Sequence, residues 1–321
     1  MMNVVNLIGR RLLQLPIMML GITFLVFFVM SFSKIDPAIT ALGEGASVEA
    51  RQEYRAAHGL DEPLLVRYVS FVSGLTRLDL GTYSARQLPV IDEVARAFPI
   101  TLQLTFFGLI IAVAFSLLLG VMAAVYRDRW PDHLIRLASI ASLSTPSFWL
   151  AILLIQLLGN KVGLISLLPT SGKLPAMTED FGGWLVRMLL PAVALAVPVI
   201  GQLSRVVRTS VVEELDRDYV RTALGAGIPW RTVVSRNVLR NALITPITVL
   251  GLRVGYLLGG AVIIEIIFNI NGMGMLILNG VTNNEPNLVQ GVTLTVALAF
   301  MVINVVVDLL YVLVNPRIRT I

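Results

Sequence analysis

Cysteine is absent from the 321 residues, which excludes disulfides, thiolate metal sites and a cysteine nucleophile. Histidine occurs only twice, at His58 and His133, far apart and both in polar stretches, so we expect no histidine metal site. Charged residues are also scarce, at 14% of the chain, whereas soluble domains carry about 25%. Hydrophobic residues make up 56%. A soluble core of this size cannot bury so much apolar surface, so the composition indicates a membrane protein.

The sequence also lacks a phosphate-binding loop of the type Gly-x-x-x-x-Gly-Lys-Ser/Thr. Gly172-Lys173 has no upstream glycine at the required spacing. No serine–histidine–aspartate triad, carboxylate pair or set of metal ligands falls at one depth. We therefore expect a chain that is not an enzyme, holds no cofactor or metal, and cannot use ATP by itself.

Long apolar runs dominate the sequence. Crossing a membrane takes about 20 residues, and several of these runs are long enough. They predict an all-α integral membrane protein with six transmembrane helices, over residues 12–32, 100–125, 135–158, 184–206, 242–268 and 290–314. The first run could be a secretory signal, but its apolar stretch is too long, so we expect a retained anchor.

Positive charge predicts the orientation, because short cytoplasmic loops are enriched in lysine and arginine. Arginine is concentrated before the first run, after the second and fourth, and at the end of the chain, whereas the two short loops on the other side carry only Lys161 and Lys173. Both termini are therefore expected in the cytoplasm. The predicted divisions are an N-terminal segment with the first helix (1–33), an extracytoplasmic cap (34–99) and a core domain (100–321). The charge pattern is that of membrane topology and not of nucleic-acid binding.

The most basic cytoplasmic loop, residues 207–241, predicts two short helices. Asp218 is a candidate N-cap, and the apolar residues that follow it share one face; they are Tyr219, Val220, Ala223 and Leu224. Gly227 is expected to end the helix in a left-handed conformation, and Pro229 to begin the second one. An exposed, apolar-faced helix of this kind either docks a partner protein or lies on the membrane surface.

The run from Asp218 to Gly227, DYVRTALGAG, with Arg240-Asn241-Ala242-Leu243 beyond it, closely resembles the signature loop of binding-protein-dependent ABC permeases. The likeness is to the dipeptide, oligopeptide and nickel branch, in its long-outer-loop type. It extends over most of the chain through further short motifs, among them Gly59-Leu60-Asp61-Glu62-Pro63, Leu168-Pro169-Thr170-Ser171-Gly172 and Asn315-Pro316-Arg317.

This resemblance implies a type I ABC importer permease in a bacterial or archaeal plasma (inner) membrane, surrounded by lipid. It implies four kinds of partner or ligand: a second, homologous permease, two ATPase subunits that bind ATP and Mg²⁺, an extracytoplasmic solute-binding protein, and a peptide or related small solute. In the family the signature loop inserts into a groove of the ATPase. The residues expected to couple to it here are Asp218, Tyr219, Val220, Ala223, Leu224, Gly227 and Arg240.

Three glycines and two charges stand out in the fifth run. Gly251, Gly255 and Gly259 form a small-xxx-small ridge, which lets helices approach closely, either within this chain or against another permease subunit. Arg253 points away from that ridge and should face a cavity or a carboxylate, because an arginine facing lipid costs about 3 kcal/mol. We expect that it lines the translocation path or forms a structural ion pair. Glu265, near the outer end, is a second candidate for the path.

A proton-coupled secondary transporter that acts alone is the alternative function, with Asp308 and Glu265 as relay residues. It predicts transport by the isolated chain. The sequence has no inverted repeat that we can identify, which does not favour this alternative.

Overall fold

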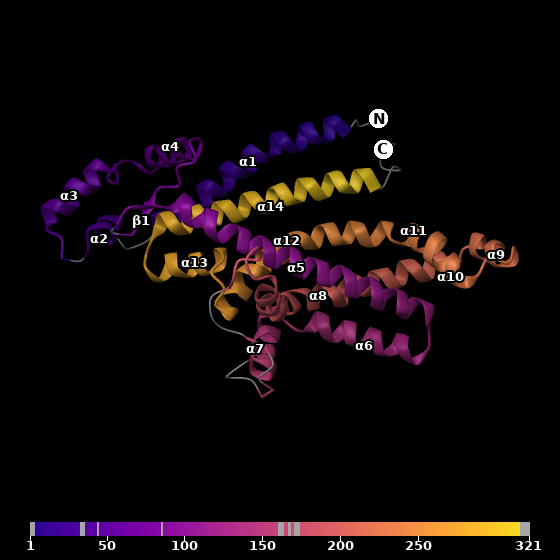
Figure 1. Cartoon of the computed structure of the whole chain (residues 1–321). Coiled ribbons are helices and arrows are strands. Elements are labelled where there is room, and N and C mark those ends of the chain that lie inside the picture. Colours follow the sequence, from indigo (N-terminus) through magenta and orange to yellow (C-terminus); the bar gives the residue numbers. More distant parts are fainter. Residues whose placement is uncertain are drawn as a thin grey trace. The chain divides into compact units, whose positions relative to one another are not determined.

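The computed structural model describes residues 4–32, 36–43, 45–84, 86–159, 164–165, 168–169 and 174–314. It is almost entirely helical (Figure 1). The chain forms two compact units: unit 1 contains Met1–Val4, Leu102–Asn269 and Ile303–Ile321, and unit 2 contains Val5–Thr101 and Ile270–Val302. Two long helices, α5 (Val90–Val125) and α14 (Pro286–Val314), contribute residues to both units.

Unit 2 is built from helices and one small hairpin, which the all-α prediction did not include. Its helices, besides the parts of α5 and α14, are α1 (Val4–Ser31), α2 (Pro37–Leu42), α3 (Val48–Ala57), α4 (Leu64–Leu75) and α13 (Met273–Thr282). Asp36 and Ser47 cap α2 and α3, because each side chain accepts a hydrogen bond from a backbone N–H of the first turn. The hairpin pairs β1 (Thr82–Tyr83) with β2 (Leu88–Pro89) in antiparallel register, Thr82 opposite Pro89.

Unit 2 has its own apolar core where the start of α5 meets α13 and the start of α14. Its buried members are Val90, Val94, Ala97, Met273, Leu288 and Val292. The Thr101 hydroxyl accepts a hydrogen bond of 2.9 Å from the backbone N–H of Met273, which fixes the first turn of α13 to α5.

Unit 1 contains the remaining helices. They are α6 (Trp130–Ser144), α7 (Ser147–Leu158), α8 (Phe181–Leu215), α9 (Asp218–Gly225), α10 (Trp230–Thr232), the π-helix η1 (Val233–Val238), α11 (Leu239–Ala242) and α12 (Ile244–Phe268). Small residues let α6 approach α8: a Cβ added to Gly201 would lie 2.7 Å from the Ser139 carbonyl, and the Ser139 and Ser204 hydroxyls are hydrogen-bonded at 3.0 Å.

Four of the described helices are long and apolar enough to cross a membrane: Val90–Val125, Phe181–Leu215, Ile244–Phe268 and the described part of α14, Pro286–Val307. They correspond to the second, fourth, fifth and sixth predicted spans. The apolar part of α1 that could be searched, Pro16–Ser31, is shorter, so a span over 12–32 stays a prediction.

The third predicted span, 135–158, is not one helix. The structure divides it into α6 and α7, which meet at an angle of 105° (Figure 1). Pro146 causes the break, because proline disfavours helical geometry in the residue before it. Thr145 is accordingly extended, with φ −96° and ψ 114°. The pair is a broken span or a re-entrant segment.

Candidate functional site

The short helix α9 ends as the sequence predicted. Gly227 has a φ of +80°, which glycine adopts without the steric cost that other residues meet. Its N–H donates to the Leu224 carbonyl at 3.0 Å, and the Ile228 N–H donates to the Ala223 carbonyl at 3.1 Å. These two bonds form a Schellman motif, so the sharp turn after α9 is fixed by its backbone.

The beginning of α9 differs from the prediction. Asp218 is not the N-cap; it is the first helical residue, and Arg217 precedes it as the cap without a side-chain hydrogen bond. In that position the Asp218 carboxylate still lies near the positive end of the helix dipole. Arg221 lies one turn on, with its guanidinium 4.0 Å from the Asp218 carboxylate. Both side chains are exposed, and so is Arg240 beyond η1.

The predicted apolar face of α9 packs mainly inside the chain and is not free for a partner. Val220 is only 2% exposed, and Tyr219 and Ala223 pack beside it against the same core. Of the four residues, only Leu224 is exposed, at 38%. Tyr219 donates a hydrogen bond of 2.8 Å from its hydroxyl to Glu214, and burial together with that carboxylate raises the pKa of Tyr219. The face was misassigned because the sequence does not reveal that η1 and α8 cover it.

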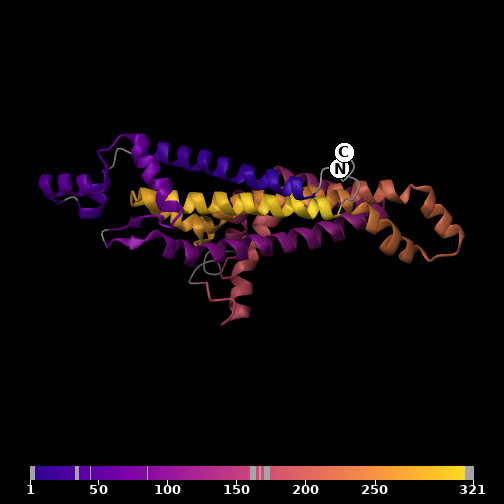
Figure 2. The ribbon, with the colours of Figure 1, turned by 90° about the horizontal axis from the view of Figure 1, so that it is seen from above.

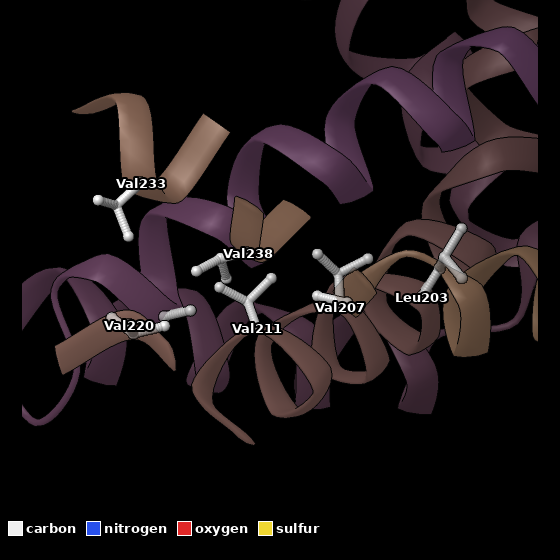
Figure 3. Close-up of a cluster of buried hydrophobic side chains, with 8 residues drawn as sticks. Leu203, Val207, Val211, Val220, Val233 and Val238 are labelled. Carbon is white, nitrogen blue, oxygen red and sulfur yellow. The ribbon is translucent and has the colours of Figure 1, made fainter. Parts of the chain in front are cut away.

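The core beneath α9 joins the short helices to the long ones. Its buried members are Ala124, Leu203, Val207, Val211, Val220, Val233, Val238 and Ala242, from α5, α8, α9, η1 and α11. Figure 3 shows Val220, Val211 and Val238 grouped together, with Val207 and Leu203 continuing along α8. Each buried valine contributes about 1.5–3 kcal/mol relative to an exposed one, so the segment is held firmly on the helices that carry it.

The turn between α9 and α10 is exposed and partly apolar. All seven residues from 224 to 230 are exposed, and three of them are large and apolar: Leu224 at 38%, Ile228 at 37% and Trp230 at 43%. Figure 2 shows this turn at the end of unit 1, beyond α8 and α12. The exposed residues of this turn, 224–230, are called the tip below.

A buried ion pair lies between α6 and α8 and was missed in the sequence. The Arg208 guanidinium donates from Nε to Asp132 Oδ1 and from Nη2 to Oδ2, both at 2.6 Å, and Asp132 is fully buried. The Asp128 N–H donates to the same carboxylate at 3.0 Å. The partners are 76 residues apart, so no sequence spacing could have paired them.

The predicted path residues on α12 lie in different surroundings. The Arg253 guanidinium carbon lies 5.9 Å from the centre of the Tyr256 ring, and no carboxylate of the described residues lies within 4.0 Å of it. Its Nε is buried without a hydrogen-bond partner in the described part of the chain. Glu265 is fully buried. The side chain of Asp308 lies outside the described residues. The structure does not bring Arg253 and Glu265 together, and their role in a path stays a prediction.

The three glycines of the predicted ridge have different surroundings. Gly251 packs inside unit 1, because a Cβ there would collide with Val307 of α14, and Gly255 is also buried. Gly259 has no atom within 4 Å of where its Cβ would be, so this position is open. Its neighbour Gly260, which the sequence did not single out, faces α8, because a Cβ added there would lie 2.9 Å from Leu195 Cδ1.

Known proteins match almost the whole chain. Residues 116–320 match the family described as binding-protein-dependent transport system inner membrane component, and residues 4–105 match the N-terminal region of such membrane components. In the part of the chain that the structure describes, no three histidine, cysteine or acidic side chains are grouped as metal ligands.

Three relatives illustrate the match. A putative peptide transport system permease protein of Brucella abortus (strain 2308) is 36% identical over 98% of each chain. A probable D,D-dipeptide transport system permease protein of Escherichia coli (strain K12) is 35% identical over 98% of this chain and 97% of its own. A glutathione transport system permease protein of the same strain is 35% identical over 98% and 99%.

These matches confirm the resemblance stated from the signature loop and the prediction of a transport subunit in place of an enzyme. They also agree with several apolar helices that are long enough to cross a membrane. The chain belongs to the family of inner membrane components of binding-protein-dependent transport systems.

Proposed function

We propose that this chain is one of two membrane-spanning subunits of an ATP-driven importer for peptides or related small solutes. The three relatives named above carry names of peptide, D,D-dipeptide and glutathione transport, all of which are short peptides or peptide-like. A second, related permease would complete the path, and an extracytoplasmic solute-binding protein would deliver the solute. The alternative, a proton-coupled transporter acting alone, is not favoured by a family whose members work with a binding protein.

The proposed arrangement in the membrane has six transmembrane segments and both termini in the cytoplasm. Residues 34–99 would form the extracytoplasmic cap, and residues 207–241 would face the cytoplasm. The excess of arginine in 207–241 supports this orientation, because cytoplasmic loops are positive. Arg253 and Glu265 remain candidates for residues that line the path.

The tip carries the proposed coupling to the ATPase. One observation supports it above the others: three apolar side chains, Leu224, Ile228 and Trp230, are exposed on a turn whose other face is buried in the chain's own core. Exposed apolar groups on a firmly held element are typical of an interface. The docking surface proposed here is therefore the tip, in place of the face formed by Tyr219, Val220 and Ala223.

This arrangement suggests how ATP energy would reach the membrane segments. ATP and Mg²⁺ would bind to the partner ATPase subunits, whose closure would push or pull the tip. Because Val220 and Val238 are packed against Val207 and Val211, a movement of the tip would be passed to α8 and not absorbed by a loose loop. The path would then open alternately to the two sides.

Gly227→Val tests the coupling segment. No atom lies within 4 Å of a Cβ at Gly227, so the substitution meets no steric contact and acts through the positive φ, at a cost of about 1–3 kcal/mol. We expect the variant to insert normally, to co-purify with less ATPase and to lose uptake in reconstituted vesicles.

Thr232→Ala is the control, because Thr232 lies in α10, beyond the tip, and has ordinary helical geometry. Alanine there should change stability by less than about 0.5 kcal/mol and preserve uptake. Ile228→Asp should abolish ATPase association with the turn intact. If Gly227→Val and Ile228→Asp both transport at the wild-type rate, the tip does not dock the ATPase.

A further inference from the structure

Unit 2 has a half-open cavity that the proposed coupling does not use. Its volume is about 740 Å³, within the usual range for sites that bind small molecules. The wall comes from the end of α1, the region from α2 to α4, and the start of α14; every lining residue belongs to unit 2. The volume exceeds what one or two waters would fill.

The charges in this wall do not all neutralise one another. Asp36 and Arg55 form an ion pair at 2.9 Å, and Arg55 also bonds Asp61 at 2.6 Å. Arg67 differs, because its guanidinium lies 5.8 Å from the centre of the Phe27 ring, and no carboxylate of the described chain is within 4.0 Å of it. Glu62 and Asp79 likewise form no ion pair with a described residue, and the Asp79 carboxylate accepts a hydrogen bond of 2.8 Å from the Gly81 N–H. The wall therefore presents one cation and two anions that no described ion pair neutralises.

Gln290 provides a second, independent observation. It lines the cavity, it is only 6% exposed, and the described residues offer its side-chain amide no hydrogen-bond partner. The Gln290 amide atoms are not among the buried side-chain atoms that lack a partner in the described residues, so the amide can be reached from the cavity and can bond an occupant. An amide donates and accepts at once, which is the pattern that a peptide bond presents in return.

The identity of the occupant follows from these three groups together. A simple anion would satisfy Arg67 and be repelled by Glu62, and a simple cation would do the reverse. A molecule with an ammonium group, a carboxylate and an amide between them could satisfy all three groups. The aromatic ring of Phe71, also in the wall, offers an apolar surface for a side chain.

We propose that this cavity binds a short zwitterionic peptide, with Arg67 facing its carboxylate, Glu62 its ammonium group and Gln290 its amide. The proposal rests on the proposed function, in which residues 34–99 face the side from which the solute arrives. The site would hold the peptide outside the path before it enters. Terminal charges, and not the side chains, would decide what it accepts.

Protection of an introduced cysteine from labelling tests the site directly, because the chain has no native cysteine. Ser70 lines the cavity and is exposed; Ser73, on the same helix, is exposed and does not line it. Each would be replaced by cysteine in the complete importer, reconstituted without the solute-binding protein, and labelled with a membrane-impermeant maleimide. Dialanine is the probe, and N-acetyl-dialanine amide, which lacks both terminal charges, is the control ligand.

We expect dialanine to slow labelling at S70C and not at S73C, and the blocked peptide to slow neither. Arg67→Gln should raise the dialanine concentration for half-maximal protection by about tenfold or more, because it removes a charged hydrogen bond. Arg67→Lys should keep most of the protection, as should Arg77→Gln, which changes an exposed arginine outside the wall.

The outcomes separate this inference from the proposed function. Uptake by the wild-type importer is measured separately, with the solute-binding protein added. If dialanine is taken up but S70C is not protected, or is protected equally by the blocked peptide, the site is wrong and the importer assignment stands. If S70C is protected in the expected pattern but no peptide is taken up, the site stands and the peptide-importer proposal fails. If neither occurs, both are wrong.

Discussion

The two units place their charges in opposite situations. In unit 1, Asp132 is fully buried and bonded at both oxygens to Arg208. In unit 2, Arg55 is 35% exposed on its side chain and shares two carboxylates at the surface. Both units join a carboxylate to a guanidinium group at similar distances. The two pairs differ in how far they are removed from water, and this difference sets the loss of stability when one partner is removed.

The hairpin of unit 2 extends this contrast, because polar contacts attach it to the rest of the unit. The Glu285 carboxylate accepts from the Ser84 N–H at 2.9 Å, and the Asn287 amide donates to the Thr82 carbonyl at 2.8 Å. The short helices of unit 1 are held instead by Val220, which is buried in the aliphatic core. Aliphatic packing of this kind does not titrate, whereas the Glu285 carboxylate that holds the hairpin of unit 2 can take up a proton.

Asp132→Ala should have the largest effect. It leaves Arg208 without its partner between α6 and α8, and breaking a buried pair in this way costs about 3–5 kcal/mol. Thermal unfolding of the purified chain in detergent measures it. Asp216→Ala is the matched control: its carboxylate bonds Arg127 at 2.9 Å but is 64% exposed, so it should cost less than about 1 kcal/mol. Equal effects would mean that burial does not distinguish the two pairs.

Much of this contrast could not be predicted from the sequence. The left-handed conformation of Gly227 was predicted correctly, because it depends on neighbours within a few residues. The break at Pro146 also had a local signal, which an uninterrupted apolar run concealed. The pairing of Asp132 with Arg208, and of Glu285 with Ser84, depends on which distant helices meet, and no period in the sequence carries that information.

The predicted docking face of α9 also shows that contacts with distant elements could not be predicted from the sequence. Hydrophobic spacing correctly indicated that Tyr219, Val220 and Ala223 share a face, but a shared apolar face can serve either a partner or the chain's own core. Only the position of η1, with Val233 and Val238, decides in favour of the core. The exposed side chains Ile228 and Trp230 follow the helix and lie outside its period, so amphipathicity could not identify them.

Substitutions at two glycines of α12 compare a packed position with an open one and should have a smaller effect on stability. Gly251→Val should destabilise the chain by about 1–3 kcal/mol, because the new side chain collides with Val307. Gly259→Val should leave the isolated chain stable, since nothing lies within 4 Å of its Cβ position. Both can be compared by thermal unfolding on the same helix. Loss of association with a second permease in Gly259→Val alone would assign the open position to that contact, and equal loss of stability would contradict the packing described here.

Arg55→Ala in unit 2 should have a smaller effect still. It breaks two ion pairs at once, with Asp36 and Asp61, but both are accessible to water, so the expected loss is about 0–1 kcal/mol. Adding salt should reduce the difference between the variant and the wild type, because exposed pairs are screened. A loss as large as that of Asp132→Ala, or one that salt does not change, would show that this pair is effectively buried.

The smallest effect should be a dependence of unit 2 on pH that runs against the usual direction. Burial raises the pKa of Glu285, although the Ser84 N–H opposes this, so the folded state holds a proton at a higher pH than the unfolded state. The desolvation penalty is therefore present at neutral pH and is relieved as the pH falls through the folded pKa, fully so below the ordinary value of about 4.3. Unit 2 should gain stability over that window.

Asp36 acts with the opposite sign, at lower pH. Burial alone would raise the pKa of Asp36, but the Ala38 N–H and the Arg55 guanidinium lower it, so its contribution is lost only as the pH falls through that lowered value. The two effects therefore separate along the pH axis. Glu285→Gln keeps an oxygen for the Ser84 N–H and removes the titration, so the melting temperature of the variant should rise less than that of the wild type on mild acidification. Exposed Glu53→Gln is the control and should follow the wild type. If the Glu285→Gln and wild-type curves stay parallel from neutral pH to the ordinary pKa of glutamate, the carboxylate is solvated and the polar attachment of the hairpin is no more sensitive to protons than the aliphatic core of unit 1.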